Sequence, residues 1–381
     1  MNNEDESTLP QQGGKNMTRD EKRSNDIPES AVKTCNFDLI VAGCNTRCRH
    51  CYVNGGPGGM MPLADFLDAL EKLDALAELL PYEAEFTLDN EPMNHPDIGV
   101  IIHAAAAAEH IRYFHHGMTA GIALMARKDR EKVMRAYLDR GFRDFGITVH
   151  GNVAHHDMIV RREGARRTAS EAAEYMRACG AEIGVSLMFN RFFREDADEI
   201  DALLERLRPD WIYIAVPNFT PHKNMMDFEP FRGTLEALHG LRTHFALRGQ
   251  RNEKPPEGVF TPGMLIKRLE GGPDIAELFL QPQDEMYLTV HPDGNLFYGN
   301  TGAETECLGN MRTLDIPAAA RRIRELPGNR DWGAFYDAGL LPGREEMIRA
   351  LKRVPGDLAY SDMASVVYRA LAETGIPTKI K

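Results

Sequence analysis

Between about residue 36 and residue 217, short apolar runs alternate with longer stretches of helical periodicity, so that a strand and a helix recur together about every 35 residues. This alternation indicates βαβ units and a parallel sheet. The predicted strands are Phe37–Ala42, Ala84–Leu88, Arg112–His116, Asp144–Val149, Glu182–Met188 and Trp211–Val216. The predicted helices lie near residues 63–80, 96–109, 127–140, 168–179 and 195–208. Six such strands favour an α/β fold, a partial (β/α)6 parallel barrel, with its chemistry in the loops after the strand ends.

The strand–helix rhythm stops after residue 217. Prolines are frequent between residues 218 and 262, and the sequence then predicts a hairpin of Met286–Val290 and Asn295–Tyr298 around an intervening His-Pro-Asp-Gly turn. The remaining residues look helical. We therefore predict a smaller α+β C-terminal domain that caps the barrel. The predicted segments are a flexible polar tail over 1–32, the barrel over 33–235 and the capping region over 236–381.

The composition narrows the function classes. The chain has 381 residues, of which 43% are hydrophobic, and this is enough to bury a core. Its net charge of −12 disfavours a nucleic-acid partner, because duplex binding depends on basic residues that neutralise phosphates. No apolar run reaches the roughly 18 residues of a membrane span, and the first 30 residues lack the apolar centre of a secretory signal. We therefore expect a cytoplasmic protein with no membrane partner.

Three cysteines, Cys44, Cys48 and Cys51, have the spacing C-x3-C-x2-C directly after the first predicted strand. In a long chain without a secretory signal, clustered cysteines indicate a metal centre rather than a disulfide framework. Thiolates are the ligands of iron–sulfur clusters, and three of them leave one iron of a four-iron cluster open to a substrate or cofactor. A zinc knuckle completed by His50 is the alternative, but zinc sites usually pair two separated cysteine units.

The cysteine loop, GCNTRCRHCY at residues 43–52, resembles the cluster loop of the radical SAM (S-adenosylmethionine) superfamily. Three further segments fit the same family in the same order. Residues 87–92, TLDNEP, are similar to the GGEP segment after the second strand. Residues 119–121, TAG, stand where the family often has TNG, and residues 147–151, ITVHG, stand where it often has ISLHG. The resemblance covers roughly residues 34–217.

The resemblance implies the cofactors and the reaction. Cys44, Cys48 and Cys51 are expected to hold a [4Fe-4S] cluster, and SAM is expected to chelate the open iron. One electron, from a donor such as flavodoxin or ferredoxin, then cleaves SAM to methionine and a 5'-deoxyadenosyl radical, which abstracts hydrogen from a substrate. The cofactors supply the difficult chemistry, and the protein supplies position and exclusion of water.

The resemblance also assigns the residues expected around SAM. Glu91 is expected to hold its amino group, although a solvated loop acid is the alternative. Asp89 and Asn90 replace the two glycines of GGEP, which leaves the backbone there less free to approach the ligand, and Asn90 is expected to lie at the cofactor. His50 is expected to pack on the adenine, or else to be a loop histidine bonded to the backbone.

Four further residues lie near the ends of the fourth and fifth predicted strands. Thr148 and His150 are candidates for the ribose hydroxyls or the substrate. Ser186 and Asn190 are candidates for the same ligands, with a structural role as the alternative. Arg166, from an arginine-rich run, can pair with a carboxylate of SAM or of an anionic substrate, unless that run is a solvated surface.

Histidines also cluster after the predicted strands. A second metal site is conceivable, but the helical H-x3-H spacing is absent. Substrate contact or proton transfer is the favoured interpretation. The histidines are His115, His116, His150, His155 and His156.

The C-terminal hairpin and residues 307–311 resemble the opening of SPASM or Twitch domains, whose cysteines bind auxiliary clusters. Only Cys35, Cys179 and Cys307 lie outside the main motif, too few for the four ligands of an auxiliary cluster. We therefore expect a degenerate SPASM/Twitch-like region without a full auxiliary cluster. Cys307 then has three possible roles: a buried structural cysteine, a hydrogen donor to a substrate radical, or a lone cluster ligand.

These observations favour a radical enzyme that acts on a small molecule or a peptide. Only about 40 residues precede the cysteine loop, and this favours a small metabolite as the substrate, in natural-product biosynthesis. The sequence leaves open whether the reaction is an epimerisation, dehydrogenation, rearrangement or bond formation. The alternative is a non-catalytic iron–sulfur or zinc protein that binds a partner. Release of 5'-deoxyadenosine on reduction separates the two.

Overall fold

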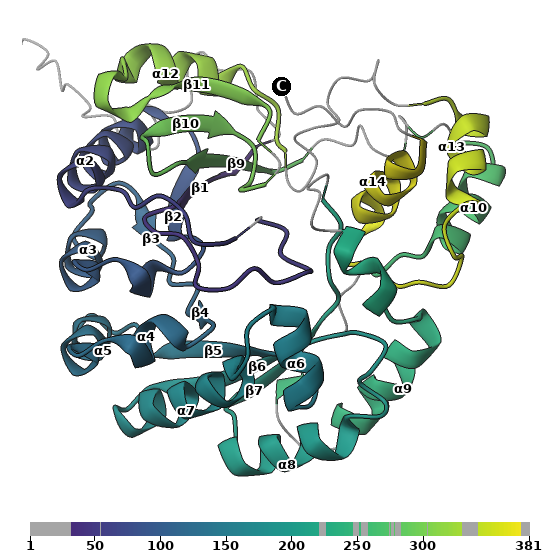
Figure 1. Cartoon of the computed structure of the whole chain (residues 1–381). Helices are drawn as coiled ribbons and strands as arrows, with labels where there is room; N and C mark the ends of the chain where they lie inside the picture. The colour runs from purple at the N-terminus through teal and green to yellow at the C-terminus, as the bar shows by residue number, and fades with distance from the viewer. Residues whose placement is uncertain are drawn as a thin grey trace, which may run out of the picture.

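Two sheets and the helices around them form an open, partial α/β barrel (Figure 1). The predicted tail, apart from Val32, lies outside the described residues. The computed structural model describes residues 32–53, 55–220, 226–246, 251–252, 258–273, 275, 278, 283–302, 304–329 and 342–374.

The first sheet has the strand order β11-β10-β9-β1-β2-β3. Its strands are β1 (Thr34–Leu39), β2 (Glu83–Leu88), β3 (Arg112–Tyr113), β9 (Glu285–Val290), β10 (Asn295–Tyr298) and β11 (Glu306–Asn310). Strands β9, β1, β2 and β3 are parallel, and β10 and β11 add on as antiparallel strands.

The second sheet is parallel throughout, in the order β4-β5-β6-β7-β8. Its strands are β4 (Met118–Thr119), β5 (Asp144–Val149), β6 (Glu182–Met188), β7 (Trp211–Ala215) and β8 (Arg251–Asn252). Strands β5 and β6 have the predicted bounds. Both are almost continuously buried after their first residue, as expected for parallel strands covered on both faces.

The predicted strand Arg112–His116 is wrong at its C-terminal end. The chain forms β3, leaves the first sheet, and enters the second sheet two residues beyond the predicted end as β4. Gly117 lies at this crossing with φ +61°, and a Cβ there would overlap the carbonyl oxygen of Asp144. The glycine therefore permits the sharp change of direction that separates the two sheets.

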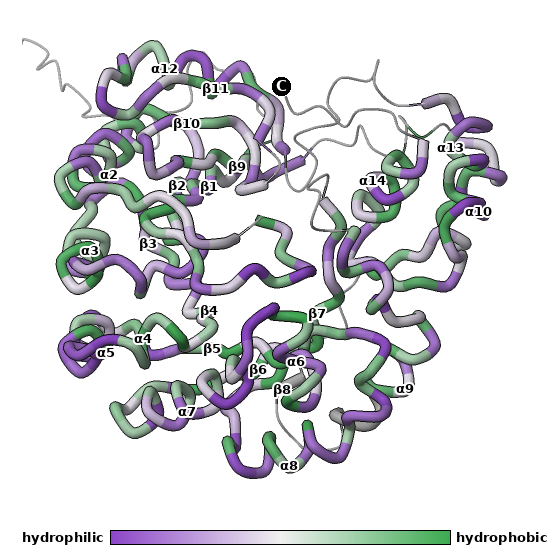
Figure 2. The backbone as a smooth tube through the Cα atoms, in the orientation of Figure 1, coloured by the Kyte–Doolittle hydropathy of each residue, from purple (hydrophilic) through white to green (hydrophobic). Residues whose placement is uncertain are grey.

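The barrel helices run outside the sheets (Figure 1). They are α2 (Leu63–Leu79), α3 (Ile98–Ala105), α4 (Ile122–Ala126), α5 (Arg130–Leu138), α6 (Val153–Val160), α7 (Ala165–Ala178), α8 (Ala197–Leu207) and α9 (Leu235–Ala246). Helix α2 shows why they pack there: Phe66, Leu70 and Leu73 recur at helical spacing and are buried. Figure 2 shows strands β5 and β7 mainly hydrophobic, whereas α7 alternates between hydrophilic and hydrophobic positions. Helices α4, α6 and α9 were not predicted.

The C-terminal hairpin has its predicted position, but it pairs with the barrel. Strand β9 lies parallel to β1, with Phe37 opposite Leu288. Strand pairing thus joins residues on both sides of the predicted boundary at residue 235. Helix α12 (Ile316–Arg324) packs against α2.

Helices α10 (Pro262–Glu270), α13 (Arg344–Leu351) and α14 (Met363–Thr374) surround a second hydrophobic core. Leu265, Met347 and Val367 contribute one residue from each helix, and all three are fully buried. Among the described helices, none is both long and apolar enough to cross a membrane.

Candidate functional site

A cavity of about 1030 Å³ occupies the barrel interior. This volume is at the upper end of the range for ligand sites, roughly 300–1,000 Å³. Its lining runs from the cysteine loop and Glu91, beyond the C-terminal strand ends, to Asp144 and Glu182, which are the first residues of β5 and β6. The cavity therefore extends along the whole length of the strands.

The cysteine loop follows β1 and folds back on itself. The backbone N–H of Cys44 donates to the carbonyl of Gly56 at 2.8 Å, and that of Met61 donates to Val41 at 3.0 Å. A Cβ at Gly43 would overlap the backbone of Gly58, so only glycine allows the two arms of the loop to approach this closely. The resulting tight loop presents its cysteines to the end of the barrel.

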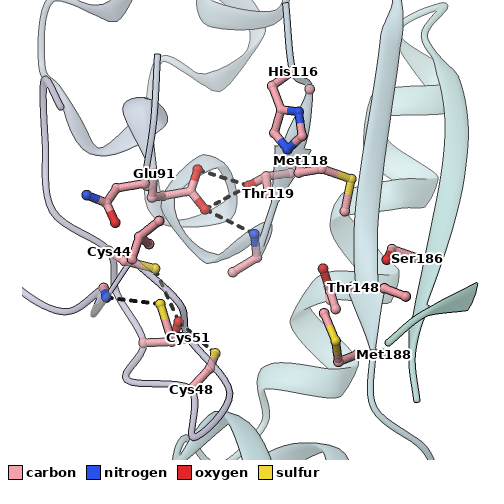
Figure 3. Close-up of a pocket in the computed structure, with 18 of the residues that line it drawn as sticks. Cys44, Cys48, Cys51, Glu91, His116, Met118, Thr119, Thr148, Ser186 and Met188 are labelled. Atoms are coloured by element: carbon pink, nitrogen blue, oxygen red, sulfur yellow. Dashed lines mark hydrogen bonds between the residues drawn. The ribbon is translucent and has the colours of Figure 1, made fainter. Parts of the chain in front are cut away.

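The three predicted cluster cysteines all line the cavity and form no disulfide. Figure 3 shows Cys44, Cys48 and Cys51 grouped at one end of it, on the same side as Glu91. The Gly55 N–H donates to Cys51 Sγ at 3.0 Å, and Cys44 Sγ lies 3.2 Å from Thr46 Oγ1.

Burial raises the pKa of Cys48 to about 11 and that of Cys51 to about 12. Thiolates at such positions require a nearby cation. Three thiolates on one loop fit the iron of an iron–sulfur cluster.

The zinc knuckle fits less well. Zinc–sulfur bonds of about 2.3 Å in a tetrahedral site bring the ligand atoms close together. Within the described residues, the only group of three or more histidine, cysteine or carboxylate ligands within 4.8 Å of one another is His155, Glu195 and Asp196. The cysteines are therefore more widely spaced than zinc ligands. His50 Nε2 instead lies 2.6 Å from His150 Nε2.

Two residues of the TAG segment, Thr119 and Ala120, hold the Glu91 side chain in place by hydrogen bonds. That side chain is 1% exposed, so the alternative of a solvated loop acid is wrong. Thr119 Oγ1 donates to both carboxylate oxygens, at 3.0 and 2.9 Å, and the Ala120 N–H donates to Oε2 at 3.0 Å. Burial raises the pKa of Glu91 to about 7, and these hydrogen bonds partly offset that effect. A cationic ligand would favour the ionised form.

Asn90 adopts φ +63°, a conformation that glycine accepts at little cost and asparagine tolerates. This accounts for asparagine at a position where the related segment has glycine. Asn90 lines the cavity, and among the described residues its buried Oδ1 has no hydrogen-bond partner. A polar ligand in the cavity could satisfy that oxygen.

Three histidines form a chain along the cavity wall, in which His50 is half-buried and His150 and His156 are buried. His150 Nε2 lies 2.6 Å from His50 Nε2, and His150 Nδ1 lies 3.3 Å from His156 Nδ1. Burial lowers the pKa of His50 to about 4 and that of His156 to about 3. Neutral imidazoles can stack on a ligand or exchange hydrogen bonds with it.

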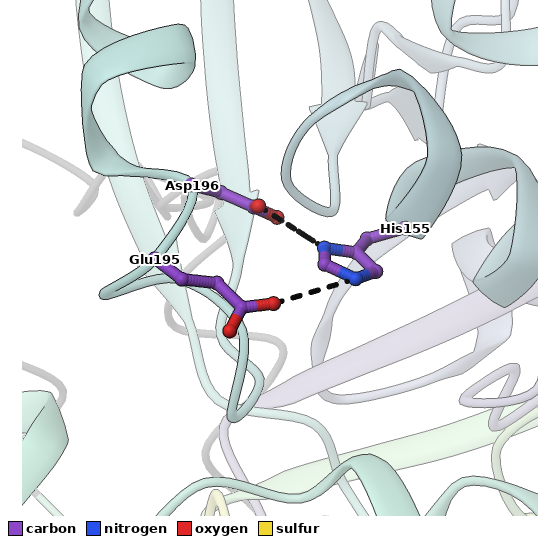
Figure 4. Close-up of side chains that lie close together, drawn as sticks. All are labelled: His155, Glu195 and Asp196. Carbon is purple, nitrogen blue, oxygen red and sulfur yellow. Dashed lines mark hydrogen bonds and ion pairs between the residues drawn. The ribbon is translucent and has the colours of Figure 1, made fainter.

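The other three histidines of the predicted cluster do not join this chain. His115 lines the cavity within a cluster of aromatic rings, and the exposed His116 also lies along the lining. His155 does not line the cavity. Its Nδ1 is 2.8 Å from Asp196 Oδ2, and its Nε2 is 3.4 Å from Glu195 Oε1 (Figure 4). The His155 ring connects α6 to the start of α8.

Thr148 and Ser186 stand side by side on β5 and β6 and line the cavity. Figure 3 shows both, with Met188, across the cavity from Glu91. Asn190 is not among the lining residues. Its Nδ2 donates to the His150 carbonyl at 2.8 Å, and its Oδ1 accepts from the Phe192 N–H, which fits the structural alternative.

Arg166 does not reach the cavity, which corrects the prediction that it binds a carboxylate of the ligand. It is buried against α6 and α7, where its Nε donates to the Gly151 carbonyl at 3.2 Å and one terminal nitrogen donates to Ser170 Oγ at 2.7 Å. Nearby Arg162 donates to the carbonyl of Asn45 in the cysteine loop. These arginines hold the protein's own backbone and side chains.

Cys307 lies on β11, is exposed, and does not line the cavity. The structure therefore does not bring this thiol to the place where a hydrogen donor would act, and the buried structural role is also wrong. The reason is topological, since β11 is the outermost antiparallel strand of the first sheet. Cys35 is buried within β1, and Cys179 caps the C-terminal end of α7.

Sequence reasoning missed several lining residues. Three of them, Met118, Trp211 and Tyr213, lie on barrel strands. A usable signal was the pair of glycines in β5 and β6 that lie in register with Trp211, because a glycine within a strand often marks the close approach of another group. Asn218 and Ser361 also line the cavity. Ser361 lies far along the chain in the C-terminal helical region, and no local pattern points to it.

Comparisons with known proteins bear on the fold and the cofactors. Residues 39–207 match the model of the radical SAM superfamily, from the end of β1 to the end of α8. No curated protein sequence matches the chain. A solved structure of SuiB from Streptococcus suis, bound to S-adenosylmethionine, has 11% sequence identity and a TM-score of 0.51, over 77% of this chain and 68% of that chain.

Two further structures are similar at a lower level. Native anSMEcpe with bound AdoMet has 12% identity and a TM-score of 0.49, over 75% of this chain and 80% of that chain. SuiB bound to its precursor peptide SuiA has 10% identity and a TM-score of 0.49, over 87% and 76% of the two chains. The likeness to SAM-bound SuiB shows a shared fold.

Proposed function

We propose that this chain, whose residues 39–207 match the radical SAM superfamily, is an enzyme that reductively cleaves SAM and abstracts hydrogen from a small molecule or a peptide held in the barrel. One observation carries the proposal: the three cysteines and the buried carboxylate of Glu91 line the same end of one cavity (Figure 3). The superfamily's cofactors are a [4Fe-4S] cluster and SAM.

When bound, the cluster and SAM supply an electron and a 5'-deoxyadenosyl radical. Cys44, Cys48 and Cys51 would hold the cluster. The Gly55 N–H would donate to the Cys51 sulfur, a contact that stabilises a thiolate. The loop closed at Gly43 keeps these sulfurs partly buried, and this limits the access of water.

Glu91 would accept the amino group of SAM. The Thr119 hydroxyl and the Ala120 N–H already point at its carboxylate, so the acceptor is oriented before the ligand arrives. Asn90 Oδ1 would accept a second donor from the ligand. The neutral rings of His50 and His150 would flank the ligand, and the hydroxyls of Thr148 and Ser186 would face the substrate from the opposite wall.

The test is anaerobic reconstitution with iron and sulfide, followed by reduction with dithionite in the presence of SAM. We expect 5'-deoxyadenosine to be released by the wild-type chain and not by the Cys44→Ala, Cys48→Ala, Cys51→Ala triple variant. Cys179→Ala, which alters a cysteine outside the cavity, is the matched control and should behave as wild type. A reconstituted chain that binds metal without releasing 5'-deoxyadenosine would instead be a non-catalytic iron–sulfur or zinc protein.

A further inference from the structure

On the barrel wall opposite Glu91, parallel strands place registered residues side by side in rows that run across the strands. We call each such row a rung. One rung consists of Thr148, Ser186 and Tyr213, on β5, β6 and β7. Within the described residues, no hydrogen bond engages the Thr148 or Ser186 hydroxyl, although both residues line the cavity. Hydroxyls on a cavity wall that have no partner in the protein are places where a polar ligand can bind.

The next rung toward the N-terminal strand ends is filled differently. Met118, Gly146, Gly184 and Trp211 are registered across β4, β5, β6 and β7. A Cβ added to Gly184 would overlap the Trp211 ring, and one added to Gly146 would lie 2.8 Å from it. The indole therefore occupies the space in front of both glycines.

A hydrogen bond fixes the far edge of this ring. Trp211 Nε1 donates to Asp144 Oδ1 at 2.7 Å, which holds the polar edge toward the N-terminal strand ends. Met118 occupies the β4 side of the same rung, and both side chains line the cavity. At this level the two largest side chains of the rung thus narrow the barrel. Rungs are two residues apart along a strand, so the narrowing lies about 6.6 Å below the hydroxyls.

We propose that Trp211 divides the cavity into a substrate chamber on the Glu91 side and a part toward the N-terminal strand ends that is lined by Asp144 and Glu182. The group entering the chamber is then compact, with a polar function held by Thr148 and Ser186 and a short apolar part against the indole. This inference rests on the proposed function and names the substrate class of that site. Substrates with a long acyl chain are disfavoured, because the carbons at the end of the chain would have to displace the Trp211 ring from its place against Gly146 and Gly184.

The first experiment removes the Trp211 ring by mutation and offers free indole in its place. Reconstituted Trp211→Ala should bind one indole per chain by calorimetry, about tenfold or more tighter than wild type, because the vacated space is apolar and shaped to that ring. Trp211→Phe keeps the rung filled and should bind indole no better than wild type. A folded Trp211→Ala chain that gains no affinity for indole overturns the proposal. If Trp211→Ala does not fold, Trp211→Leu with benzene replaces it under the same criterion.

The second experiment tests substrate class with linear primary amides of increasing length, with S-adenosylhomocysteine present to fill the SAM end. In wild type, affinity should stop rising once the chain reaches Trp211. In Trp211→Ala it should continue to rise, by about fourfold for each added methylene. The same length dependence in both proteins would contradict a depth limit at Trp211. Release of 5'-deoxyadenosine, measured on separate samples of the same proteins with SAM in place of S-adenosylhomocysteine, separates this result from failure of the proposed function.

Discussion

The Thr119 hydroxyl donates to both carboxylate oxygens of Glu91, at 3.0 and 2.9 Å, across 28 residues of sequence. The contact joins the loop after β2 to the second residue of β4. It orients a buried carboxylate that has no basic side chain as a hydrogen-bond partner among the described residues. A site arranged in this way is prepared for a cationic ligand.

SAM affinity should rise with pH through about 7. Burial holds the pKa of Glu91 above its ordinary value of 4.5, at about 7, and the amino group of SAM binds the ionised form. Glu91→Gln should remove this pH dependence and, at about pH 8, weaken SAM binding roughly tenfold to a hundredfold, since one charge-assisted contact is lost. Calorimetric titration over pH measures both. Glu83→Gln, at an exposed position of β2, is the control and should leave the dependence of SAM affinity on pH unchanged.

The same shift predicts how the metal-free chain responds to pH. The folded state binds the Glu91 proton more tightly than the unfolded state does. The contribution of Glu91 to stability is therefore greatest below pH 4.5 and declines as pH rises to about 7. Denaturant unfolding of wild type and Glu91→Gln at several pH values measures it. A difference between the two proteins that stays constant over this range would show that Glu91 is not buried as described.

The chain should bind one cluster of about four irons. The three cavity cysteines are the motivation, because Cys35, Cys179 and Cys307 lie elsewhere. Iron and sulfide analysis after anaerobic reconstitution checks the number. The triple alanine variant of the cavity cysteines should lose the cluster, and about eight irons per wild-type chain would contradict a single cluster.

Cys307→Ala should release 5'-deoxyadenosine at the wild-type rate and should form the same product. The thiol is exposed on β11, outside the cavity. Once a substrate is known, turnover in heavy water tests the same point, because a protein thiol that donates hydrogen carries solvent deuterium into the product. Loss of product in Cys307→Ala, with 5'-deoxyadenosine still released, would restore the donor role.

Gly184→Ala should destabilise the fold by about 1–3 kcal/mol, because its Cβ would overlap the Trp211 ring. Gly240→Ala, in α9 with open space around the added Cβ, should instead stabilise the fold by up to about 1 kcal/mol through helix propensity. Urea unfolding compares the two. If Gly184→Ala were neutral, the ring would not lie where the rung places it.

The local features of the chain could be predicted from its sequence alone. Hydrophobic periodicity located β5 and β6 and placed α2 to within a residue, because a single element carries its own pattern. The spacing of Cys44, Cys48 and Cys51 identified a metal loop, because all three ligands lie on one turn of chain. The hairpin around residues 291–294 was equally local, since its turn residues specify it.

Which distant segments meet became clear from the folded chain and could not be predicted. Folding paired β9 with β1, buried Glu91 against Thr119, and directed Arg166 away from the cavity toward Gly151 and Ser170. It also left Cys307 on an outer strand. Each outcome depends on which strand edges pair and which side chains lose contact with water. Those free energies come from contacts between residues far apart in sequence, and no local pattern encodes them.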